Sequence, residues 1–529
     1  MKNPSMKTTT KIGVLLATAA LPLGLTSCFS QSEADADAIR IALQFTPVAD
    51  FSPYSDDAIL NTQMGAAETL VAIDEDGEVQ PKIAESFDVV DDKTVVFTLR
   101  EGATFHDDSA VDAEAVAGSL NNIFGATTRP KGVGKADLSA EATGPREVTV
   151  RSAETDPILV QRFSDPGTII LAPGAYTGES PDPFGFGTGP YEMTEKHADG
   201  SLTLSAHPTY YNGAPVTQTL QVSFIEDGAA RVNALRAGEQ DLVRGVPIVS
   251  LNDLGDGAAV LGVDTARANL LHFNTDKGVF ADAQLRRAVA AAIDATPVVA
   301  DIFEGEAADP KGSLFNRSWE WANSAGAEIS ATTDADAATT NAATTTDAAT
   351  TTDADDATDA ATTDAAALGE GKKIRLATWD SRPELPDTAN LIADQLRKLG
   401  FEVELVVADY NSLEAQLLDG TFDAIVASRN YLFGAGDPVS FLETDFSCEG
   451  SYNLSQYCDP ATDAKIAAAA KLATGEQRLE AAASIGRDIV EDGAVVSLAH
   501  ERLHIGVQGV ENVAVDALER YLVTEKISK

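Results

Sequence analysis

The first residues that could perform chemistry are His500-Glu501-Arg502-Leu503-His504, which match the H-E-x-x-H string of zinc hydrolases. The string binds one metal ion only on a helix, where residues four apart face the same way and lie about 6 Å apart. The flanking residues 494–499 and 505–507 are typical of a strand, on which the two histidines would lie about 13 Å apart. Zinc hydrolysis is therefore a distant alternative. No G-x-S-x-G string, Walker loop or metal-spaced cysteine set indicates another catalytic activity.

Two cysteines near the end of the chain are the next reactive pair. Cys448 and Cys458 lie ten residues apart, with Gly450 and several polar residues between them. In an exported protein such a pair most simply forms a loop-closing disulfide, which would stabilise the fold by about 2–3 kcal/mol through loop entropy. Metal ligation is the alternative, but no histidine lies nearby to complete a site. We expect a structural disulfide and no bound metal.

The first 27 residues have the pattern of a secretory signal peptide. Three lysines precede an apolar run, Ile12–Leu25, which is shorter than the roughly 20 apolar residues of a membrane span. The run leads to Leu25-Thr26-Ser27-Cys28, which resembles a bacterial lipobox, in which the cysteine is diacylated and becomes the mature N-terminus. A signal peptide with a chance cysteine is the alternative. The resemblance implies an extracytoplasmic protein anchored to the cell membrane at Cys28, with residues 28–38 as a tether.

The charge balance excludes several classes of partner. The chain has 38 Lys and Arg against 82 Asp and Glu, a net charge of −44. Removal of the signal peptide, which carries three lysines and no acid, changes this to −47. Nucleic acids and anionic membrane surfaces require a basic face, so we expect no nucleic-acid partner and membrane contact only through the lipid. The acidity itself indicates a soluble, self-repelling protein and names no function. We expect a monomer.

One stretch differs in composition from the rest of the chain. Residues 331–367 contain only Ala, Thr and Asp apart from Asn341. The stretch has no apolar periodicity, and alanine alone cannot offset the entropy lost on ordering it. We predict a solvated, disordered low-complexity insert over residues 325–371. Threonine-rich exported tracts are sometimes O-glycosylated, and a low-complexity repeat tolerated on the surface is the simpler interpretation.

Outside this insert, short apolar runs typical of strands alternate with amphipathic stretches typical of helices. We expect strands at residues 39–45, 94–100, 220–225, 241–243, 374–378, 403–407 and 424–427. We expect helices at residues 112–123, 228–237, 282–294, 388–399 and 413–418. The alternation predicts an α/β fold with βα units around largely parallel sheets, and ligands at strand ends or between lobes.

A series of short strings then stands in order along the chain: Glu68-Thr69-Leu70-Val71, Pro81-Lys82-Ile83-Ala84-Glu85-Ser86-Phe87, Phe97-Thr98-Leu99-Arg100-Glu101-Gly102, Phe105-His106-Asp107, Ala113-Glu114-Ala115-Val116, Gly187-Thr188-Gly189-Pro190-Tyr191, His207-Pro208-Thr209-Tyr210-Tyr211, Ala237-Gly238-Glu239-Gln240-Asp241, Leu285-Arg286-Arg287-Ala288-Val289 and Asp437-Pro438. Their order and spacing resemble the family 5 extracellular solute-binding proteins, the oligopeptide-, dipeptide- and nickel-binding receptors of ABC importers. The resemblance covers nearly all of residues 39–520 except the insert.

The resemblance implies a two-lobed periplasmic-binding-protein fold of the class II type, with an extra subdomain on the first lobe and hinge closure on a solute. It assigns residues 39–57, 176–265 and 503–529 to lobe I, 58–175 to its subdomain and 266–502 to lobe II. It implies a receptor, not an enzyme and without a cofactor, that passes a peptide or similar carboxylate-bearing solute to ABC-transporter permease subunits. A nickel or metal-chelate receptor of the same family is the alternative, and signalling without uptake also stays open.

The resemblance also implies site residues. In dipeptide-binding relatives an Arg before a Pro, just beyond a second-lobe strand, pairs with the ligand carboxylate, and Arg382 occupies that position; the alternative is a surface Arg beside Glu384. Peptide-binding relatives hold the ligand amine with an Asp four residues before the Pro of the Asp-Pro pair, where this chain has Gly434. Asp437 could substitute only in a remodelled loop, and its alternative role is a helix cap ahead of residues 439–443.

Four aromatic side chains complete the predicted ligand contacts. Tyr431 and Phe433 precede the Asp-Pro pair, and Phe45 and Tyr54 follow the first strand. Aromatic rings supply large contact areas at a small entropic cost, so we expect them to line the cleft. Their alternative place is the hydrophobic core.

Overall fold

The structure is a computed structural model that describes residues 37–74, 77–178, 180–323, 368–380, 382 and 384–529. The predicted signal peptide, Cys28, most of the tether and nearly all of the insert lie outside the described residues. Within the described part of the chain, no helix combines the length and the apolar character needed to cross a membrane.

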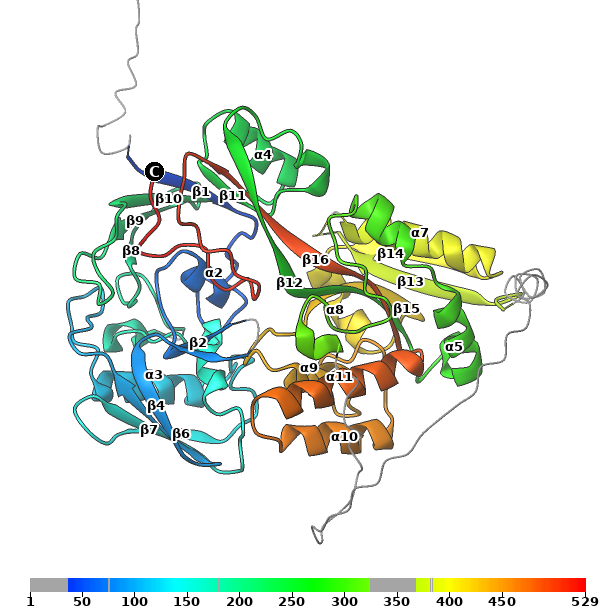
Figure 1. Ribbon diagram of the computed structural model, residues 1–529, viewed down its shortest axis with the longest axis horizontal. Helices are drawn as coiled ribbons and strands as arrows, with labels where there is room; N and C mark the ends of the chain where they lie inside the picture. Colours follow the sequence, from blue (N-terminus) through cyan, green and yellow to red (C-terminus); the bar gives the residue numbers. More distant parts are fainter. Residues whose placement is uncertain (1–36, 75–76, 179, 324–367, 381, 383) are drawn as a thin grey trace, which may run out of the picture. The chain divides into compact units, whose positions relative to one another are not determined.

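A ten-stranded sheet organises most of the molecule, in the order β14-β13-β15-β12-β16-β11-β1-β10-β9-β8 (Figure 1). Its two long central strands, β12 (Ala258–Phe273) and β16 (Val495–Gln508), are antiparallel neighbours. On one side of them lies a first half-sheet: β11 (Leu242–Arg244), β1 (Ile39–Leu43), β10 (Thr219–Phe224), β9 (Leu202–Ala206) and β8 (Tyr191–Lys196). On the other side lies a second half-sheet: β15 (Ala424–Asn430), β13 (Lys373–Trp379) and β14 (Glu402–Ala408).

Parallel pairing occurs only inside the two half-sheets, around β1 in the first and around β13 in the second. β1 runs parallel to β10 and β11, and β13 runs parallel to β14 and β15. The two central strands and the β8–β9 hairpin pair antiparallel with their neighbours. The expectation of largely parallel sheets is therefore wrong. The chain crosses between the half-sheets in β12 and returns in β16, and these two strands run antiparallel to each other and to their outer neighbours, β15 and β11.

A separate four-stranded sheet, in the order β4-β5-β7-β6, is antiparallel throughout. Its strands are β4 (Ala84–Asp91), β5 (Thr94–Leu99), β6 (Leu138–Ala142) and β7 (Glu147–Ser152). On β5, Val95, Phe97 and Leu99 are buried while the intervening side chains are more open, as a half-buried strand requires. Helix α3 (Ala113–Gly125) packs on β6 and β7, and the Asp112 carboxylate caps it by accepting the Ala115 N–H.

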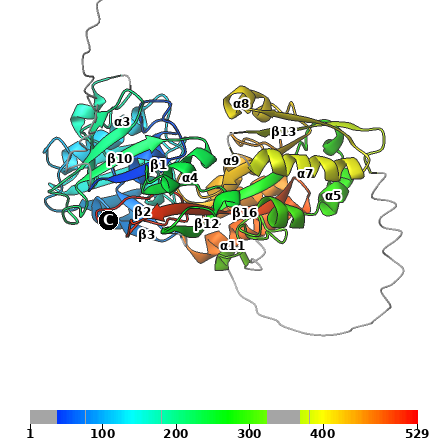
Figure 2. The ribbon, with the colours of Figure 1, turned by 90° about the horizontal axis from the view of Figure 1, so that it is seen from above.

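Helices cover the second half-sheet and the region beyond it. α7 (Glu384–Lys398) packs on β13 and β14 through Leu385, Ala389, Ile392 and Leu396 (Figure 2). The other helices of the fold are α2 (Ala58–Gln63), α4 (Gly228–Arg236), α5 (Ala283–Ala292), α8 (Tyr410–Leu418), α9 (Pro438–Phe446), α10 (Pro460–Ala470) and α11 (Glu476–Glu491). Every strand and helix expected above is present, with ends shifted by a few residues.

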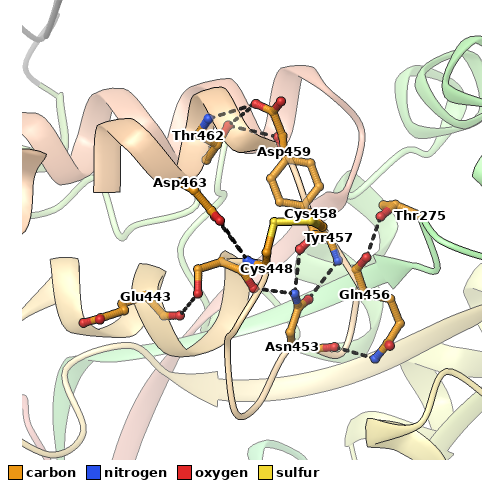
Figure 3. Close-up of a disulfide and its surroundings, with 11 residues drawn as sticks. Thr275, Glu443, Cys448, Asn453, Gln456, Tyr457, Cys458, Asp459, Thr462 and Asp463 are labelled. Atoms are coloured by element: carbon orange, nitrogen blue, oxygen red, sulfur yellow. Dashed lines mark hydrogen bonds between the residues drawn. A yellow bond between two sulfur atoms is a disulfide. The ribbon is translucent and has the colours of Figure 1, made fainter. Parts of the chain in front are cut away.

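The predicted disulfide joins Cys448 and Cys458 in the loop between α9 and α10 (Figure 3). The loop it closes is also held from inside, because the Asn453 side chain donates to the carbonyls of Ser447 and Tyr457 at 3.0 Å and 2.7 Å. These contacts make the bond a structural one, as expected.

Candidate functional site

The candidate site lies at the carboxyl ends of the parallel strands. β11 ends at Arg244 and β15 ends at Asn430. β13 ends at Trp379, and Arg382 follows shortly before α7. In open α/β sheets, ligands bind outside the carboxyl ends of the strands. The side chains at these ends are therefore the first candidates for contact with a solute.

Three arginines and two glutamates gather there into a buried group that we call the arginine cluster: Arg244, Arg267, Arg382, Glu501 and Glu519. Glu519 accepts hydrogen bonds from Arg244 at 3.3 Å and from Arg267 at 2.6 Å and 3.1 Å. Arg382 Nη1 donates to Glu501 Oε2 at 3.2 Å. Arg244 lies on β11, Arg267 on β12 and Glu501 on β16, so the cluster joins the first half-sheet to the central strands.

Amide and hydroxyl side chains hold the two carboxylates of the cluster in place. Glu501 Oε1 accepts hydrogen bonds from Asn269 at 2.7 Å and from Ser428 at 2.5 Å. Glu519 Oε2 accepts one from Asn430 at 3.2 Å. Because Ser428 and Asn430 lie on β15, the second half-sheet also contributes to the cluster.

The two carboxylates differ in how strongly they stay ionised. At Glu519 burial favours the neutral form, but the charges of Arg267, Arg244 and Arg382 outweigh it and hold the pKa far below its ordinary value. At Glu501 burial dominates and raises the pKa, although the charge of Arg382 opposes the rise. Glu519 therefore fixes Arg244 and Arg267 firmly, whereas Arg382 has the weaker partner.

Arg382 and Arg267 are the two guanidinium groups of the cluster that are open to solvent, with side chains 18% and 17% exposed, against 3% for Arg244. Of these two, Arg382 has the weaker carboxylate partner. Glu384, which is 19% exposed, lies 3.7 Å from Arg382 at the outer edge of the cluster. A guanidinium offers two parallel hydrogen bonds that match a carboxylate. The arrangement can therefore bind a solute carboxylate that displaces Glu384 from Arg382, with Arg244 and Arg267 adding positive charge behind it.

Two of the predicted ligand contacts are structural. Asp437 caps α9 by accepting the Ser440 N–H at 2.9 Å, and both of its oxygens bind the Arg478 guanidinium at 2.8 Å and 2.7 Å. The helix-cap alternative is confirmed, and both carboxylate oxygens of Asp437 are engaged inside the protein. Tyr431 is 1% exposed and its hydroxyl accepts the Asn316 N–H at 2.9 Å. Tyr431 thus lies in the hydrophobic core, the alternative stated above.

The other three aromatic residues stay open to contact. Phe433 is half-buried, and its ring lies 4.9 Å from Lys131 Nζ. Phe45, just beyond the carboxyl end of β1, is 41% exposed. Tyr54 is half-buried and lines a cavity of about 800 Å³ between the loops that follow β1 and α3. The residues lining this cavity do not include the arginine cluster, so Tyr54 belongs to a different surface.

The His500-Glu501-x-x-His504 string lies on β16, a strand as the sequence indicated. Alternation along a strand sends Glu501 to the face opposite the two histidines. His500 Nε2 lies 3.3 Å from the Ser313 carbonyl oxygen and His504 Nε2 lies 3.2 Å from Glu306 Oε2, so each histidine has its own partner. Nowhere in the described ranges do three His, Cys, Asp or Glu side chains form a group that could hold a metal ion. The zinc alternative is therefore wrong in its geometry, and the glutamate serves the arginine cluster instead.

Sequence reasoning found Arg382 and missed the rest of the cluster. Arg244 directly follows the predicted strand 241–243, so its place at a carboxyl end was a usable signal. Arg267 lies inside β12, which no expected element covered, and Glu519 lies in a C-terminal segment without strand or helix pattern. No local pattern marks either residue.

The sequence agrees with this architecture when it is compared with known proteins. Residues 78–453 match the family described as bacterial extracellular solute-binding proteins, family 5 Middle. The chain belongs to this family. Family 5 proteins are solute-binding components of ABC importers that act outside the cytoplasm.

Relatives within family 5 include receptors for nickel and for peptides. The nickel-binding protein NikA of Staphylococcus aureus is 24% identical over 443 residues, which cover 82% of each chain. Its crystal structure with Ni(L-His)2 aligns with 93% of this chain and 99% of that chain, at 22% identity and a TM-score of 0.72. The oligopeptide-binding protein AppA of Bacillus subtilis, solved with a nonapeptide, aligns over 93% and 98% of the chains, at 18% identity and a TM-score of 0.71. These likenesses confirm the expected two-lobed fold of family 5.

Proposed function

We propose that this chain is a lipid-anchored substrate-binding protein that captures a peptide or similar carboxylate-bearing solute by lobe closure and delivers it to an ABC permease. The observation that carries the proposal is the arginine cluster at the carboxyl ends of the parallel strands. Arg382 supplies the guanidinium that a solute reaches, while Glu519 orients Arg244 and Arg267 behind it. A buried guanidinium group of this kind suits a carboxylate better than a sugar or a bare cation.

Lobe closure is supported by an irregularity in the central strands. The β12–β16 ladder shifts register between Asp264 and Ala268, and Arg267 lies inside that interruption. There the Ala266 N–H donates to the Ala517 carbonyl at 3.2 Å instead of to β16. Interrupted pairing bends a strand and lets a few residues absorb a change in backbone angles. A solute that contacts Arg382 and the cluster behind it would therefore bias this hinge towards a closed state.

The experiment that tests the carboxylate site compares matched ligands. Dipeptides such as L-Met-L-Leu and their C-terminal carboxamides are added to the purified protein, and the melting temperature and Kd are measured. A ligand that binds only the folded state at 100 times its Kd adds about 2.7 kcal/mol to the free energy of unfolding. We expect carboxylates to stabilise the protein and carboxamides to bind at least about 10-fold more weakly, because a charge-assisted hydrogen bond contributes about 1.5–3 kcal/mol.

Arg382→Ala is the variant for this test, and Arg151→Ala is its control. Arg151 is 50% exposed and pairs with Glu141 on the four-stranded sheet. Its replacement removes the same charge as Arg382→Ala, at a position far from Arg382 in the sequence. We expect Arg382→Ala to weaken carboxylate binding about 10- to 100-fold and Arg151→Ala to leave it unchanged. The proposal fails if no carboxylate solute raises the melting temperature, or if Arg382→Ala leaves the Kd unchanged.

A metal-chelate receptor is the second candidate, favoured by relatives named for nickel. Two relatives were solved in complex with Ni(L-His)2 and with Fe(III)-EDTA, whose ligands bear carboxylates. Because no group of metal-ligating side chains was found in the described part of this chain, such a cargo would be held through its carboxylates by the arginine cluster. A melting-temperature rise with nickel and histidine together, absent with peptides and with nickel alone, would select this candidate.

The lipid anchor is tested on the chain expressed in a bacterium with its own signal peptide. We expect the intact mass of the mature protein to match residues 28–529 plus a diacylglyceryl group, and the protein to enter the detergent phase of a two-phase extraction. Two buried acyl chains, at about 0.8 kcal/mol per methylene, are sufficient for stable membrane attachment. The Cys28→Ser variant should stay in the aqueous phase, and an unmodified mass at Cys28 would refute lipidation.

A further inference from the structure

A segment that follows the short helical turn Val298–Ile302 lies along the central strand β16. We call this segment, residues 303–316, the strap. The Ala308 N–H donates to the His500 carbonyl at 2.9 Å, and the His500 N–H donates to the Ala308 carbonyl at 3.0 Å, which makes an antiparallel bridge. β12 pairs with the other edge of β16 at His500. The strap therefore occupies the edge that β11 occupies from Ile505 onwards.

The strap is anchored in the cores of the second half-sheet and its helices. Phe303 and Ala307 are buried in the core that contains the inward-facing side chains of β13 and β15. Leu314 and Phe315 are buried in the core beneath α9 and α11. Both ends of the strap are thus fixed to the same part of the molecule. A movement of the second half-sheet therefore carries the strap with it.

One side chain of the strap reaches the part of β16 that belongs to the first half-sheet. Glu306 Oε2 lies 3.2 Å from Nε2 of His504, and the residue after His504, Ile505, pairs with Arg244 of β11. The register shift of the β12–β16 ladder falls between the partners of Arg502 and those of His500. The strap therefore binds β16 on both sides of the irregularity at which we placed the hinge.

The strap and the arginine cluster lie on opposite faces of β16. His500 and His504 point to one face and Glu501 to the other, because side chains alternate along a strand. His500 Nε2 lies 3.3 Å from the Ser313 carbonyl oxygen, which is also part of the strap. Both histidines of the H-E-x-x-H string thus bind the strap, while the glutamate between them serves the arginine cluster. A bend of the central strands would change the contacts on both faces.

His504 is the titratable group of the strap contact. It is 5% exposed, whereas the side chain of Glu306 is 44% exposed and open to water. The other charged groups that face it are Arg502 on its own strand and Asp264 on β12, and two backbone N–H groups that follow β11 donate to its carbonyl oxygen. Burial lowers the pKa of His504 below its ordinary value, although Glu306 and Asp264 oppose the change. The imidazole is therefore neutral here at pH 7.

We propose that the strap is a pH-sensitive restraint on the hinge, which holds the two half-sheets in the present arrangement while His504 is neutral and releases them when His504 binds a proton. The inference rests on the proposed function, because it gives solute capture by lobe closure a dependence on pH. The stabilisation by neutral His504 is complete above about pH 6.5 and is lost as the pH falls. Acid favours an arrangement that exposes the imidazole to water, and the affinity for the solute falls.

The test measures the Kd of L-Met-L-Leu by calorimetry at pH 7.0 and pH 5.5, between which the dipeptide keeps both of its charges. We expect the wild-type Kd to rise about 3- to 8-fold on acidification. The upper limit is that of one group with an ordinary pKa of about 6.5 that binds no proton in the closed arrangement. His504→Gln, which keeps an N–H donor for Glu306, should match the wild type within about twofold at pH 7.0 and lose most of the pH effect.

His197→Gln is the matched control, because His197 is an exposed histidine in the turn of the β8–β9 hairpin. We expect this variant to keep the full pH effect. Glu306→Ala changes an exposed side chain and provides a second test if His504→Gln does not fold. It should weaken binding about 3- to 10-fold at pH 7.0 and reduce the pH effect, because the strap then lacks its contact with His504.

Small-angle X-ray scattering of the solute-free protein gives a readout that does not depend on binding. The radius of gyration should be larger at pH 5.5 than at pH 7.0 in the wild type and unchanged in His504→Gln. A wild-type Kd that is equal at both pH values, or an equal pH effect in His504→Gln, overturns the strap proposal and leaves the arginine cluster standing.

Failure of the proposed function is recognised separately. If no carboxylate solute binds at either pH, the proposed function fails, and the scattering alone decides on the strap. A wild-type radius of gyration that does not change with pH, or that changes equally in His504→Gln, then overturns the strap proposal as well. A larger radius at pH 5.5 that requires His504 supports the restraint on the hinge.

Discussion

Replacement of Asp437 tests whether the Asp-Pro motif supports the fold or the ligand. Asp437 caps α9 and forms two hydrogen bonds with Arg478 of α11, and the two side chains are 6% and 4% exposed. Arg478 Nη1 also donates to the carbonyls of Ala469, Ala470 and Leu472 at the end of α10. The pair therefore ties three helices together. Its loss should affect stability and not the Kd for a solute.

The expected magnitude follows from the burial of both partners. Asp437→Ala leaves the Arg478 guanidinium buried without its counter-charge, which costs about 3–5 kcal/mol, including about 1 kcal/mol for the lost helix cap. The structure describes about 440 residues. At about 2.1 cal/mol/K per residue, a cooperative unfolding of this size loses about 1 °C per kcal/mol. The melting temperature should fall by about 3–5 °C, and Asp437→Asn, which keeps a good cap, should lose slightly less.

The assay is urea unfolding of the wild type, Asp437→Ala, Arg478→Met and the double variant. Replacing a whole buried ion pair by apolar side chains often changes the free energy of unfolding very little. The double variant should therefore be more stable than the sum of the two single-variant losses predicts. Burial alone would raise the pKa of Asp437, but the Arg478 guanidinium and the Ser440 hydrogen bonds lower it below its ordinary value. The stabilising effect of Asp437 is therefore complete above about pH 4 and is lost as the pH falls further.

Two results would refute this reasoning. If Asp437→Ala changes the free energy of unfolding by less than about 1 kcal/mol, the pair does not hold the helices as described. If the same variant weakens dipeptide binding about 10-fold while its stability is kept, Asp437 contacts the ligand after all. Strict additivity of the two single variants would also contradict a direct interaction between the side chains.

Two further predictions concern the disulfide and the buried histidines. The double variant Cys448→Ser, Cys458→Ser should lose about 2–3 kcal/mol of unfolding free energy in urea, and equal stability of this variant and the oxidised protein would contradict the structural role. Burial lowers the pKa of His272 to about 3 and of His106 and His500 to about 4, below the unfolded value of about 6.5. The stability from these neutral imidazoles is therefore complete above pH 6.5 and is lost on acidification, so the urea midpoint should fall from pH 7 to pH 4 and fall less steeply in His272→Phe. A flat profile in both proteins would refute this.

The sequence predicted the helices and strands well because burial of one face leaves a periodic pattern of apolar residues in each of them. The strand expected at 374–378 is β13, with Ile374 and Leu376 fully buried, and the helix expected from residue 388 is α7. α7 begins earlier, at Glu384, because Pro386 lies in its first turn, where the missing N–H would have no partner in any case. The direction of a strand relative to its neighbours leaves no such pattern. The antiparallel pairing of β12 and β16 was therefore not expected.

The site could be predicted only where one segment carries the signal. Arg382 was found from its neighbours in the chain, whereas its partner Glu501 is 119 residues away. Arg244 and Glu519 are 275 residues apart, and their pairing depends on the fold bringing the C-terminal segment beside β11. For Tyr431 and Asp437 the sequence left a structural and a ligand-binding role open, because a loop next to a cleft and a loop inside a core have similar compositions. Only the distant partners, Asn316 and Arg478, distinguish the two.

The backbone at Glu519 shows how the C-terminal segment contacts the arginine cluster and the β15–α9 loop at the same time. Glu519 has φ +65°, a left-handed conformation that costs a non-glycine residue about 1–3 kcal/mol and persists only where the surroundings enforce it. Here Glu519 reaches the arginines of the cluster, while the next side chain, Arg520, reaches Ser164, Leu432 and Gly434. Two adjacent residues of opposite charge thus hold the arginine cluster and the loops around Ser164 and Gly434. Because glycine accepts this φ without strain but lacks the carboxylate, Glu519→Gly would relax the backbone and still release Arg244 and Arg267, so the strain is kept for the contacts that it permits.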